Sequence, residues 1–234
     1  MGQYDDLKEK VFHANIELWK SGVVFSTFGN VSGIDRRSGV MAIKPSGVAY
    51  DELTPEQMVL VDMENKVIDE SRRPLRPSSD TKTHLFLYAH FPETGGAVHT
   101  HSAYATAWAQ AGRAIPVLGT THADQTAFDI PCTAGMSAEQ ITRDYETETG
   151  RQIVDTFRNL SYQEIPMVLV RSHGPFSWGD TPARAVHNSV MLEQLARLAH
   201  LTLQLEPRAA RLDPALIKKH YERKHGKDAY YGQP

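Results

Sequence analysis

The amino-acid sequence predicts an α/β sandwich whose sheet is largely antiparallel. Two observations carry this prediction. Short apolar runs are separated by turn residues, as on either side of positions 35–39, which is typical of β-hairpins. Helix-start signals such as Thr181-Pro182 and Asp213-Pro214 stand ahead of helices of ordinary length. Hairpins mixed with such helices indicate this layered architecture.

The first part of the chain should form one helix followed by two hairpins. Apolar positions recur at helical spacing up to Gly22 and then give way to short runs broken by turn residues. In chain order we expect a helix over 4–21, a hairpin over 31–44, a helix start at Thr54-Pro55, and a second hairpin over 58–63 and 66–69.

The rest of the chain should hold the longer helices and the remaining strands. Small polar residues or prolines mark most of the helix starts. In chain order we expect a loop over 72–77, a helix over 80–91 capped by Ser79 or Asp80, a strand over 97–101, and a helix from Ser102 as cap through Gln110. A loop-rich stretch should follow, and then a helix that begins at the capping box of 137–140 and is broken near Gly150. The remaining elements should be strands over 168–171 and 176–178 and helices over 182–205 and 214–225.

The composition is that of a soluble globular protein. With 234 residues, 41% hydrophobic and 23% charged, the chain can bury a substantial core, and the absence of repeats or linkers predicts a single domain over 1–234. The net charge of −3 favours neither nucleic acid nor an anionic membrane as a partner. The lone Cys132, with no signal peptide or long apolar run, predicts a cytoplasmic protein without disulfides.

His99 and His101 form the strongest functional signal. On a strand, side chains alternate between faces, so both imidazoles should point the same way. Two histidines at such positions would leave polar nitrogens without partners, and a metal ion satisfies both. Asp80 and His173 complete a possible set of four ligands, although Asp80 also suits an ordinary helix cap. Zinc is the usual occupant of such a mixed site.

Three short segments combine glycines with hydrogen-bond donors, at 28–33, 44–47 and 77–79. None matches a nucleotide-binding loop. Their backbone N–H groups and serine hydroxyls could together surround a phosphate, whereas each segment taken alone is more simply a turn.

These motifs resemble those of the L-ribulose-5-phosphate 4-epimerases, in the class II aldolase superfamily. The resemblance extends over nearly the whole chain, and no position used by that family departs from its pattern. The matching motifs lie at 28–33, 43–48, 77–81, 98–102, 119–124, 172–176, 223–226 and 230–233.

The resemblance implies a class II aldolase-like sandwich, with helices on both faces of the sheet, that acts on a phosphorylated ketopentose. It implies Zn²⁺, or another divalent metal, on Asp80, His99, His101 and His173. It assigns acid–base catalysis to Asp124 and Tyr231 in a homotetramer with active sites between subunits. The implied substrate contacts are Gly29, Asn30, Lys44, Ser46, Gly47, Ser78 and Ser79.

The chemistry of a 2-ketopentose fits this assignment. Its C4 hydrogen is β to the carbonyl and is not acidic, so C4 cannot be inverted by simple deprotonation. Breaking and re-forming the C3–C4 bond remains, with a metal and tuned acid–base groups to stabilise the charges. This predicts epimerisation of L-ribulose 5-phosphate to D-xylulose 5-phosphate.

Two alternatives remain open. One is a class II sugar-phosphate aldolase of the fuculose- or rhamnulose-phosphate type. In fuculose-type aldolases, a glutamate typically takes the place of Asp80, so the aspartate favours the epimerase. The other is a metal-free binding protein on the same fold, as in the adducin head. The intact candidate ligand set argues against it.

Overall fold

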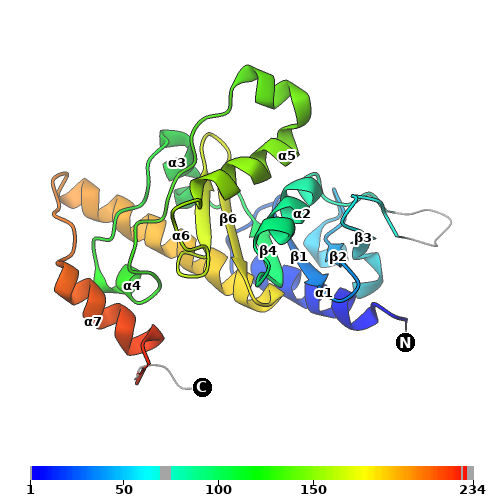
Figure 1. The fold of residues 1–234 in the computed structure, drawn as a ribbon, viewed down its shortest axis with the longest axis horizontal. Coiled ribbons are helices and arrows are strands. Elements are labelled where there is room, and N and C mark those ends of the chain that lie inside the picture. The colour runs from blue at the N-terminus through cyan, green and yellow to red at the C-terminus, as the bar shows by residue number, and fades with distance from the viewer. Residues whose placement is uncertain (1, 69–74, 228, 231–234) are drawn as a thin grey trace.

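A continuous antiparallel sheet forms the centre of the protein. The computed structural model describes residues 2–68, 75–227 and 229–230. Within them, six strands pair in the order β3-β2-β1-β4-β6-β5, and every neighbouring pair is antiparallel (Figure 1). The predicted architecture is therefore confirmed. The strands are β1 (Asn30–Asp35), β2 (Val40–Ile43), β3 (Val59–Val61), β4 (Gly96–His99), β5 (Met167–Val170) and β6 (Gly174–Gly179).

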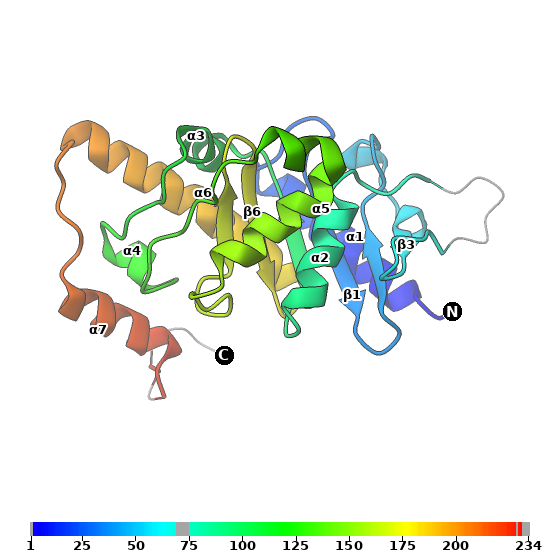
Figure 2. The same cartoon turned by 45° about the horizontal axis from the view of Figure 1, so that its top comes forward.

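Helices cover both faces of this sheet (Figures 1 and 2). On β4, Val98 packs in a cluster with residues of α1 and α6, whereas the neighbouring Ala97 packs in a cluster with residues of α2. This alternation is the strand periodicity that makes a two-faced sheet possible. The helices are α1 (Asp5–Lys20), α2 (Thr81–His90), α3 (Ala103–Ala111), α4 (Thr120–Ala123), α5 (Ala138–Thr156), α6 (Pro182–Leu205) and α7 (Pro214–His225), with short 3₁₀ turns η1 (Tyr50–Glu52) and η2 (Pro55–Gln57).

Some expected boundaries were wrong. The strand with His99 ends there, so His101 lies just beyond it. In the second hairpin, β3 is followed by only an isolated bridge between Val61 and Val67. Positions 69 and 72–74 of the expected strand and loop lie outside the described residues. The stretch expected to be loop-rich contains the short helix α4.

Two predicted helix caps, Asp80 and Ser102, were right in position, but their side chains do not make the expected capping hydrogen bonds. At α3 the cap comes from Glu193 on α6, whose carboxylate accepts from the N–H groups of Tyr104 and Ala105, each at 2.9 Å. A buried carboxylate stabilises a helix N-terminus because it faces unpaired N–H groups and the positive end of the dipole.

Helix α5 runs through Gly150, where a break was expected. A side chain at Gly150 would place its Cβ 2.6 Å from Cβ of Phe86, so the glycine allows α2 and α5 to approach closely. The irregular residue is instead Asp144, with φ −164° and ψ 85°. Its carboxylate accepts from Lys82 of α2 at 2.9 Å and from Thr147 at 3.0 Å.

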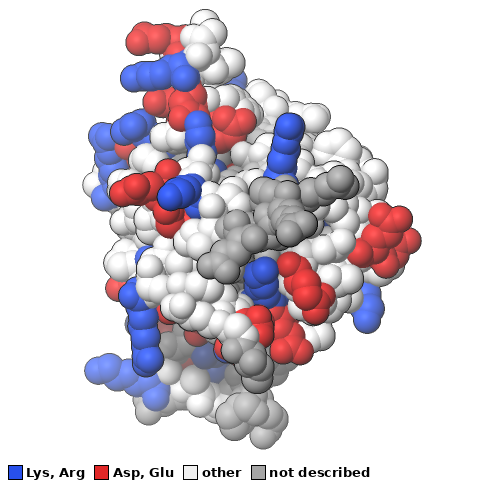
Figure 3. All heavy atoms as spheres, turned by 90° about the vertical axis from the view of Figure 1, so that its right-hand side faces the viewer, with Lys and Arg blue, Asp and Glu red and all other residues white. Residues whose placement is uncertain are grey.

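The described surface mixes charges of both signs. On the face in Figure 3, Lys and Arg side chains lie among Asp and Glu side chains. An arrangement of this kind gives no large field of one sign on that face. Among the described residues, no helix combines the length and the apolar character needed to cross a membrane.

Candidate metal centre and substrate pocket

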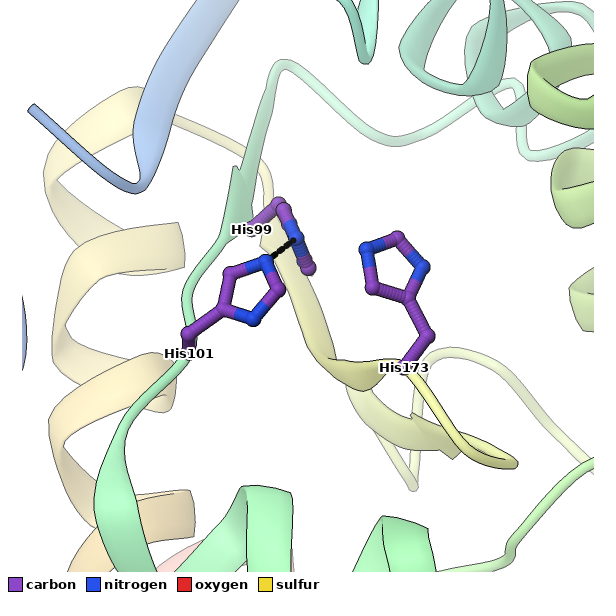
Figure 4. Close-up of side chains that lie close together, drawn as sticks. All are labelled: His99, His101 and His173. Atoms are coloured by element: carbon purple, nitrogen blue, oxygen red, sulfur yellow. Dashed lines mark hydrogen bonds between the residues drawn. The ribbon is translucent and has the colours of Figure 1, made fainter.

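Three histidines from two separate segments meet at one end of the central strands. His99 ends β4 and pairs with Asn30 of β1 and Phe176 of β6. His173 lies in the turn between β5 and β6, where Ser172 adopts a left-handed φ of +62°. Figure 4 shows the three rings facing a common space. The tight turn and the strand pairing together bring His173 beside a histidine that is distant in the sequence.

The geometry of these rings suits metal binding. One ligand atom from each histidine lies within 4.8 Å of the others, and Nε2 of His99 is 3.1 Å from Nε2 of His101. Nδ1 of His99 lies 3.0 Å from the carbonyl oxygen of Pro175 and can donate to it. That tautomer leaves a lone pair on Nε2, which is the arrangement that orients histidine ligands in metal sites. Tetrahedral zinc places nitrogen ligands about 3.3 Å apart, close to the observed separation.

Local electrostatics favour the neutral, metal-binding form of His101 and His173. Burial, followed by the charge that His99 can carry, lowers the pKa of His173 to about 3, against the opposing effect of Asp80. Burial and His99 also lower the pKa of His101. Metal ions compete with protons for the same lone pairs, so a lowered pKa favours metal binding near neutral pH.

Asp80 lies in the same cavity at the start of α2. Its Oδ2 accepts from Nδ2 of Asn30 at 2.7 Å and faces the hydroxyl of Ser78 at 3.5 Å. Burial raises the pKa of Asp80, but His99, His84 and the Asn30 hydrogen bond outweigh it and hold the pKa below its usual value. The side chain is therefore an anion beside the histidine cluster. It is not part of the three-histidine group itself.

Lys44 is a buried cation at the end of β2. It is 1% exposed, and its Nζ donates to the carbonyl oxygens of Val48 at 2.7 Å and Pro45 at 3.4 Å. Burial lowers its pKa to about 8. Among the described residues no carboxylate pairs with it, which leaves a buried positive charge available to an anionic ligand.

A single cavity of about 340 Å³ brings together the candidate metal ligands and all the candidate substrate contacts. Its wall includes loops from three separate parts of the chain. The predicted residues in its lining are Gly29, Asn30, Lys44, Ser46, Gly47, Ser78, Ser79, Asp80, His99, His101 and His173. The structure thus places the donor-rich loops, which looked like separate turns in the sequence, around the same space as the histidines.

Three residues of this wall lie outside the segments that sequence reasoning singled out, and they are Thr27, Tyr145 and Glu146. The hydroxyl of Tyr145 lies 3.3 Å from Nδ1 of His173. Tyr145 and Glu146 follow the irregular Asp144, and the hydroxyl of Thr83 on α2 donates to the carbonyl oxygen of Glu146 at 2.7 Å. Their placement depends on contacts between α2 and α5, and no local spacing could have revealed it.

Asp124 does not line this cavity. It follows α4, and its carboxylate accepts from Nε and Nη2 of Arg223 on α7 at 2.9 and 2.6 Å. Nδ1 of His220 lies 3.1 Å from the same carboxylate. Burial raises the pKa of Asp124, but these hydrogen bonds outweigh it and hold the pKa below its usual value. Tyr231, the other predicted acid–base residue, lies outside the described residues.

The donor set therefore fits a divalent metal. Neutral imidazoles and a carboxylate are the ligand types of catalytic zinc sites, and the cavity leaves room beside them. The buried amide oxygen of Asn30 has no hydrogen-bond partner among the described residues. An unpaired buried acceptor beside the cavity is a group that a bound molecule or ordered water would satisfy.

Comparison with known proteins agrees with this geometry. The family model described as "Class II Aldolase and Adducin N-terminal domain" matches residues 9–200. An L-fuculose 1-phosphate aldolase structure is 21% identical with a TM-score of 0.77, covering 93% of this chain and 95% of that chain. L-fuculose 1-phosphate aldolase from Glaciozyma antarctica PI12 is 17% identical with a TM-score of 0.76, covering 97% and 84%. YgbL from Klebsiella pneumoniae is 21% identical with a TM-score of 0.70, covering 94% and 99%. The chain belongs to the class II aldolase and adducin N-terminal domain family.

Proposed function

We propose that this protein is a metal-dependent enzyme that interconverts L-ribulose 5-phosphate and D-xylulose 5-phosphate by inverting C4. The observation that carries the proposal is the shared cavity, in which a three-histidine cluster and Asp80 face donor-rich loops around Lys44. A metal site next to an anion site suits a small sugar phosphate, whose carbonyl oxygen can meet the metal while its phosphate occupies the anion site. The chain acts in this proposal as one domain.

His99, His101, His173 and Asp80 would hold the metal, with zinc as the first candidate. A divalent cation held there supplies a Lewis acid that polarises a carbonyl and stabilises negative charge developing on oxygen. The carbonyl oxygen of Pro175 fixes the orientation of His99. The Asn30 amide similarly fixes the carboxylate of Asp80, so that the ligands are ordered in advance.

The loops around Lys44 would hold the phosphate. The hydroxyls of Ser46, Ser78 and Ser79 and the N–H groups of Gly47 and Ser79 would supply donors, and the ammonium of Lys44 a positive charge. The N–H groups of Ser46 and Ser78 instead donate to backbone carbonyl oxygens at 2.9 and 3.1 Å. Gly47 has a left-handed φ of +74°, with no atom within 4 Å of the position of an added Cβ. A backbone so exposed can approach a ligand closely.

Epimerisation would proceed by carbon–carbon cleavage. Loss of the C4 hydroxyl proton and breakage of the C3–C4 bond give glycolaldehyde phosphate and the enediolate of dihydroxyacetone. The phosphate loops retain the aldehyde while it turns to present its opposite face. Renewed C3–C4 bond formation and protonation of the new C4 oxygen then give the other epimer, so all atoms are conserved.

The two faces of the aldehyde require two proton-transfer groups, for which we propose Asp124 and Tyr231. Asp124 does not line the metal cavity of its own chain, so in this proposal it acts on the cavity of another copy. Helix α7, which contacts Asp124, leads into the tail that carries Tyr231. We propose a homotetramer, in which neighbouring subunits complete one another's sites.

Incubation of metal-loaded protein with L-ribulose 5-phosphate tests this function. We expect D-xylulose 5-phosphate to accumulate toward equilibrium, with both epimers resolved by chromatography. Build-up of dihydroxyacetone and glycolaldehyde phosphate without xylulose phosphate would instead identify an aldolase. Protein that binds no divalent metal and converts no ketose phosphate would indicate the binding-protein alternative.

A further inference from the structure

Tyr50 lies immediately behind the cavity and is not part of its wall. It begins the short turn η1, is 2% exposed, and belongs to the cluster that packs against α1. Neither the metal ligands nor the proposed phosphate contacts include it. A buried tyrosine usually needs a partner for its hydroxyl, so the partners of this one are informative.

The hydroxyl of Tyr50 holds one of the two loops that meet at the cavity. It donates to the carbonyl oxygens of Gly29 at 2.9 Å and Phe28 at 3.1 Å. Burial raises the pKa of Tyr50, which keeps the hydroxyl protonated and able to donate. Gly29 has a left-handed φ of +83°, and a Cβ there would lie 3.2 Å from the carbonyl oxygen of His99 and 3.3 Å from the Tyr50 hydroxyl. The loop is therefore held between the tyrosine and the end of β4.

The ring of Tyr50 contacts the other loop. Nζ of Lys44 lies 4.8 Å from the ring centroid, within the range of a cation–π interaction. On the same ring, Trp19 of α1 lies nearly parallel, with centroids 6.3 Å apart and an interplanar angle of 7°. The two carbonyl hydrogen bonds of Lys44 and this aromatic face constrain a long side chain that would otherwise be free to rotate.

We infer that Tyr50 is a positioning residue for anion binding. Its ring orients the Lys44 ammonium, and its hydroxyl fixes the Phe28-Gly29 loop beside it. The inference rests on the proposed function, because it assumes that Lys44 meets the phosphate of the substrate. It assigns to Tyr50 no contact with substrate or metal.

The test separates the two roles of the side chain. Tyr50→Phe keeps the ring and removes the hydroxyl, whereas Tyr50→Leu removes both. In zinc-loaded protein titrated with inorganic phosphate and followed by phosphorus NMR, we expect the phosphate Kd to rise about threefold for Tyr50→Phe. We expect a rise of about tenfold or more for Tyr50→Leu, because the cation–π contact is also lost.

A double-mutant cycle with Lys44→Met distinguishes positioning from a general folding defect. If the ring acts through Lys44, Tyr50→Leu should bind phosphate more weakly than Tyr50→Phe only while Lys44 is present. In Lys44→Met protein, the phosphate Kd values of the same two variants should differ by less than about twofold. Equal differences in both backgrounds would overturn the inference. If Tyr50→Leu fails to fold, the phosphate Kd of Tyr50→Phe decides alone: the expected rise supports the inference, and an unchanged Kd overturns it.

Tyr88→Phe is the matched control. Tyr88 is 1% exposed, its hydroxyl bonds to Ser32, and Arg36 lies over its ring at 5.4 Å. The Tyr88→Phe substitution removes a buried hydroxyl, so it should lower the stability of the protein without changing the phosphate Kd. An unchanged Kd in Lys44→Met protein would reject the phosphate site and the inference together. Loss of phosphate binding in Lys44→Met, with wild-type binding in Tyr50→Phe and Tyr50→Leu, would reject the inference alone.

Discussion

The metal cavity and the region around Asp124 were expected to serve one reaction. They differ in how many of their polar groups already have partners within a single chain. In the metal cavity, histidine and carboxylate side chains line a common space. Asn30 keeps an orphaned amide oxygen, and Lys44 has no carboxylate partner among the described residues. At the Asp124 region, by contrast, Arg223 and His220 already satisfy the carboxylate.

The cavity therefore has features of a binding site, whereas Asp124 makes a contact between helices within one chain. The cavity keeps two groups that a ligand could engage, because the Asn30 amide oxygen has no hydrogen-bond partner and Lys44 has no carboxylate partner among the described residues. Asp124 joins α4 to α7, and its lowered pKa makes it a weak base. Figures 1 and 2 show α4 and α7 together at the end of the molecule opposite to α1 and β3. The acid–base role proposed for Asp124 therefore depends on contacts beyond its own chain.

The largest effect is expected from the metal cluster. His99→Asn removes a ligand nitrogen that Pro175 orients, so we expect loss of bound metal and a fall in kcat of about a thousandfold or more. Metal content by elemental analysis and turnover of L-ribulose 5-phosphate measure both effects. The exposed His13, replaced in the same way, should change neither. Full activity of metal-free His99→Asn protein would contradict the proposed role.

Tyr231→Phe should separate metal binding from proton transfer. Loss of the phenolic proton should reduce kcat about a hundredfold while metal content stays at the wild-type level. The kcat and the metal content of Tyr231→Phe and wild-type protein are measured on the same preparations and compared. Normal turnover would show that the tail has no acid–base role. Loss of metal would place Tyr231 in the metal site instead.

A smaller effect is expected from the charge of Lys44. Its pKa of about 8 in the folded protein predicts that phosphate binding weakens as pH rises through 8, because the ammonium loses its proton. Phosphate Kd measured between pH 6.5 and about 9.5 should rise over this window and flatten in Lys44→Met. A wild-type profile retained in Lys44→Met would assign the titration to another group.

The lowered pKa of Lys44 also affects folding stability, which should rise with pH where phosphate binding weakens. The folded protein binds its Lys44 proton less tightly than the unfolded chain, whose lysine pKa is near 10.5. This group therefore makes the folded state more stable as pH rises from about 8 toward 10.5. Urea unfolding across that range should show a smaller rise for Lys44→Met than for the wild type.

The smallest effect is expected at the Asp124 contact. Arg223→Gln removes the two-point hydrogen bond to Asp124, which should cost about 1–2 kcal/mol of stability at neutral pH. Because the pKa of Asp124 is lowered on folding, its contribution is present above the unfolded pKa and is lost as pH falls through the folded pKa. Arg223→Gln should therefore flatten the acid side of the stability profile. An unchanged acid side would show that this contact does not hold α7.

Local signals predicted much of the fold. Thr181-Pro182 and Asp213-Pro214 do begin α6 and α7, and in both the predicted cap side chain accepts from the helix backbone. The apolar run before His99 predicted a strand at this place, although the strand ends at His99 and does not reach His101 as expected. These features depend on neighbours within a few residues, so the sequence displays them directly.

Features that depend on distant contacts could not be predicted in this way. Glu193 caps α3 from another helix, and Lys82 holds the irregular Asp144 that precedes Tyr145. Nothing in the spacing around Asp124 indicates that Arg223 pairs with it. The loops around Lys44 were suggestive from composition, but only the paired strands bring them beside the histidines.

The hydrogen at C4 distinguishes cleavage of the C3–C4 bond from removal of the C4 proton when the reaction runs in deuterium oxide. Metal-loaded protein is given L-ribulose 5-phosphate in that solvent, and the products are observed by proton NMR. Because cleavage of C3–C4 never breaks the C4–H bond, we predict D-xylulose 5-phosphate that retains its original hydrogen at C4. Deuterium at C4, or no xylulose phosphate at all, would rule out epimerisation by cleavage of the C3–C4 bond.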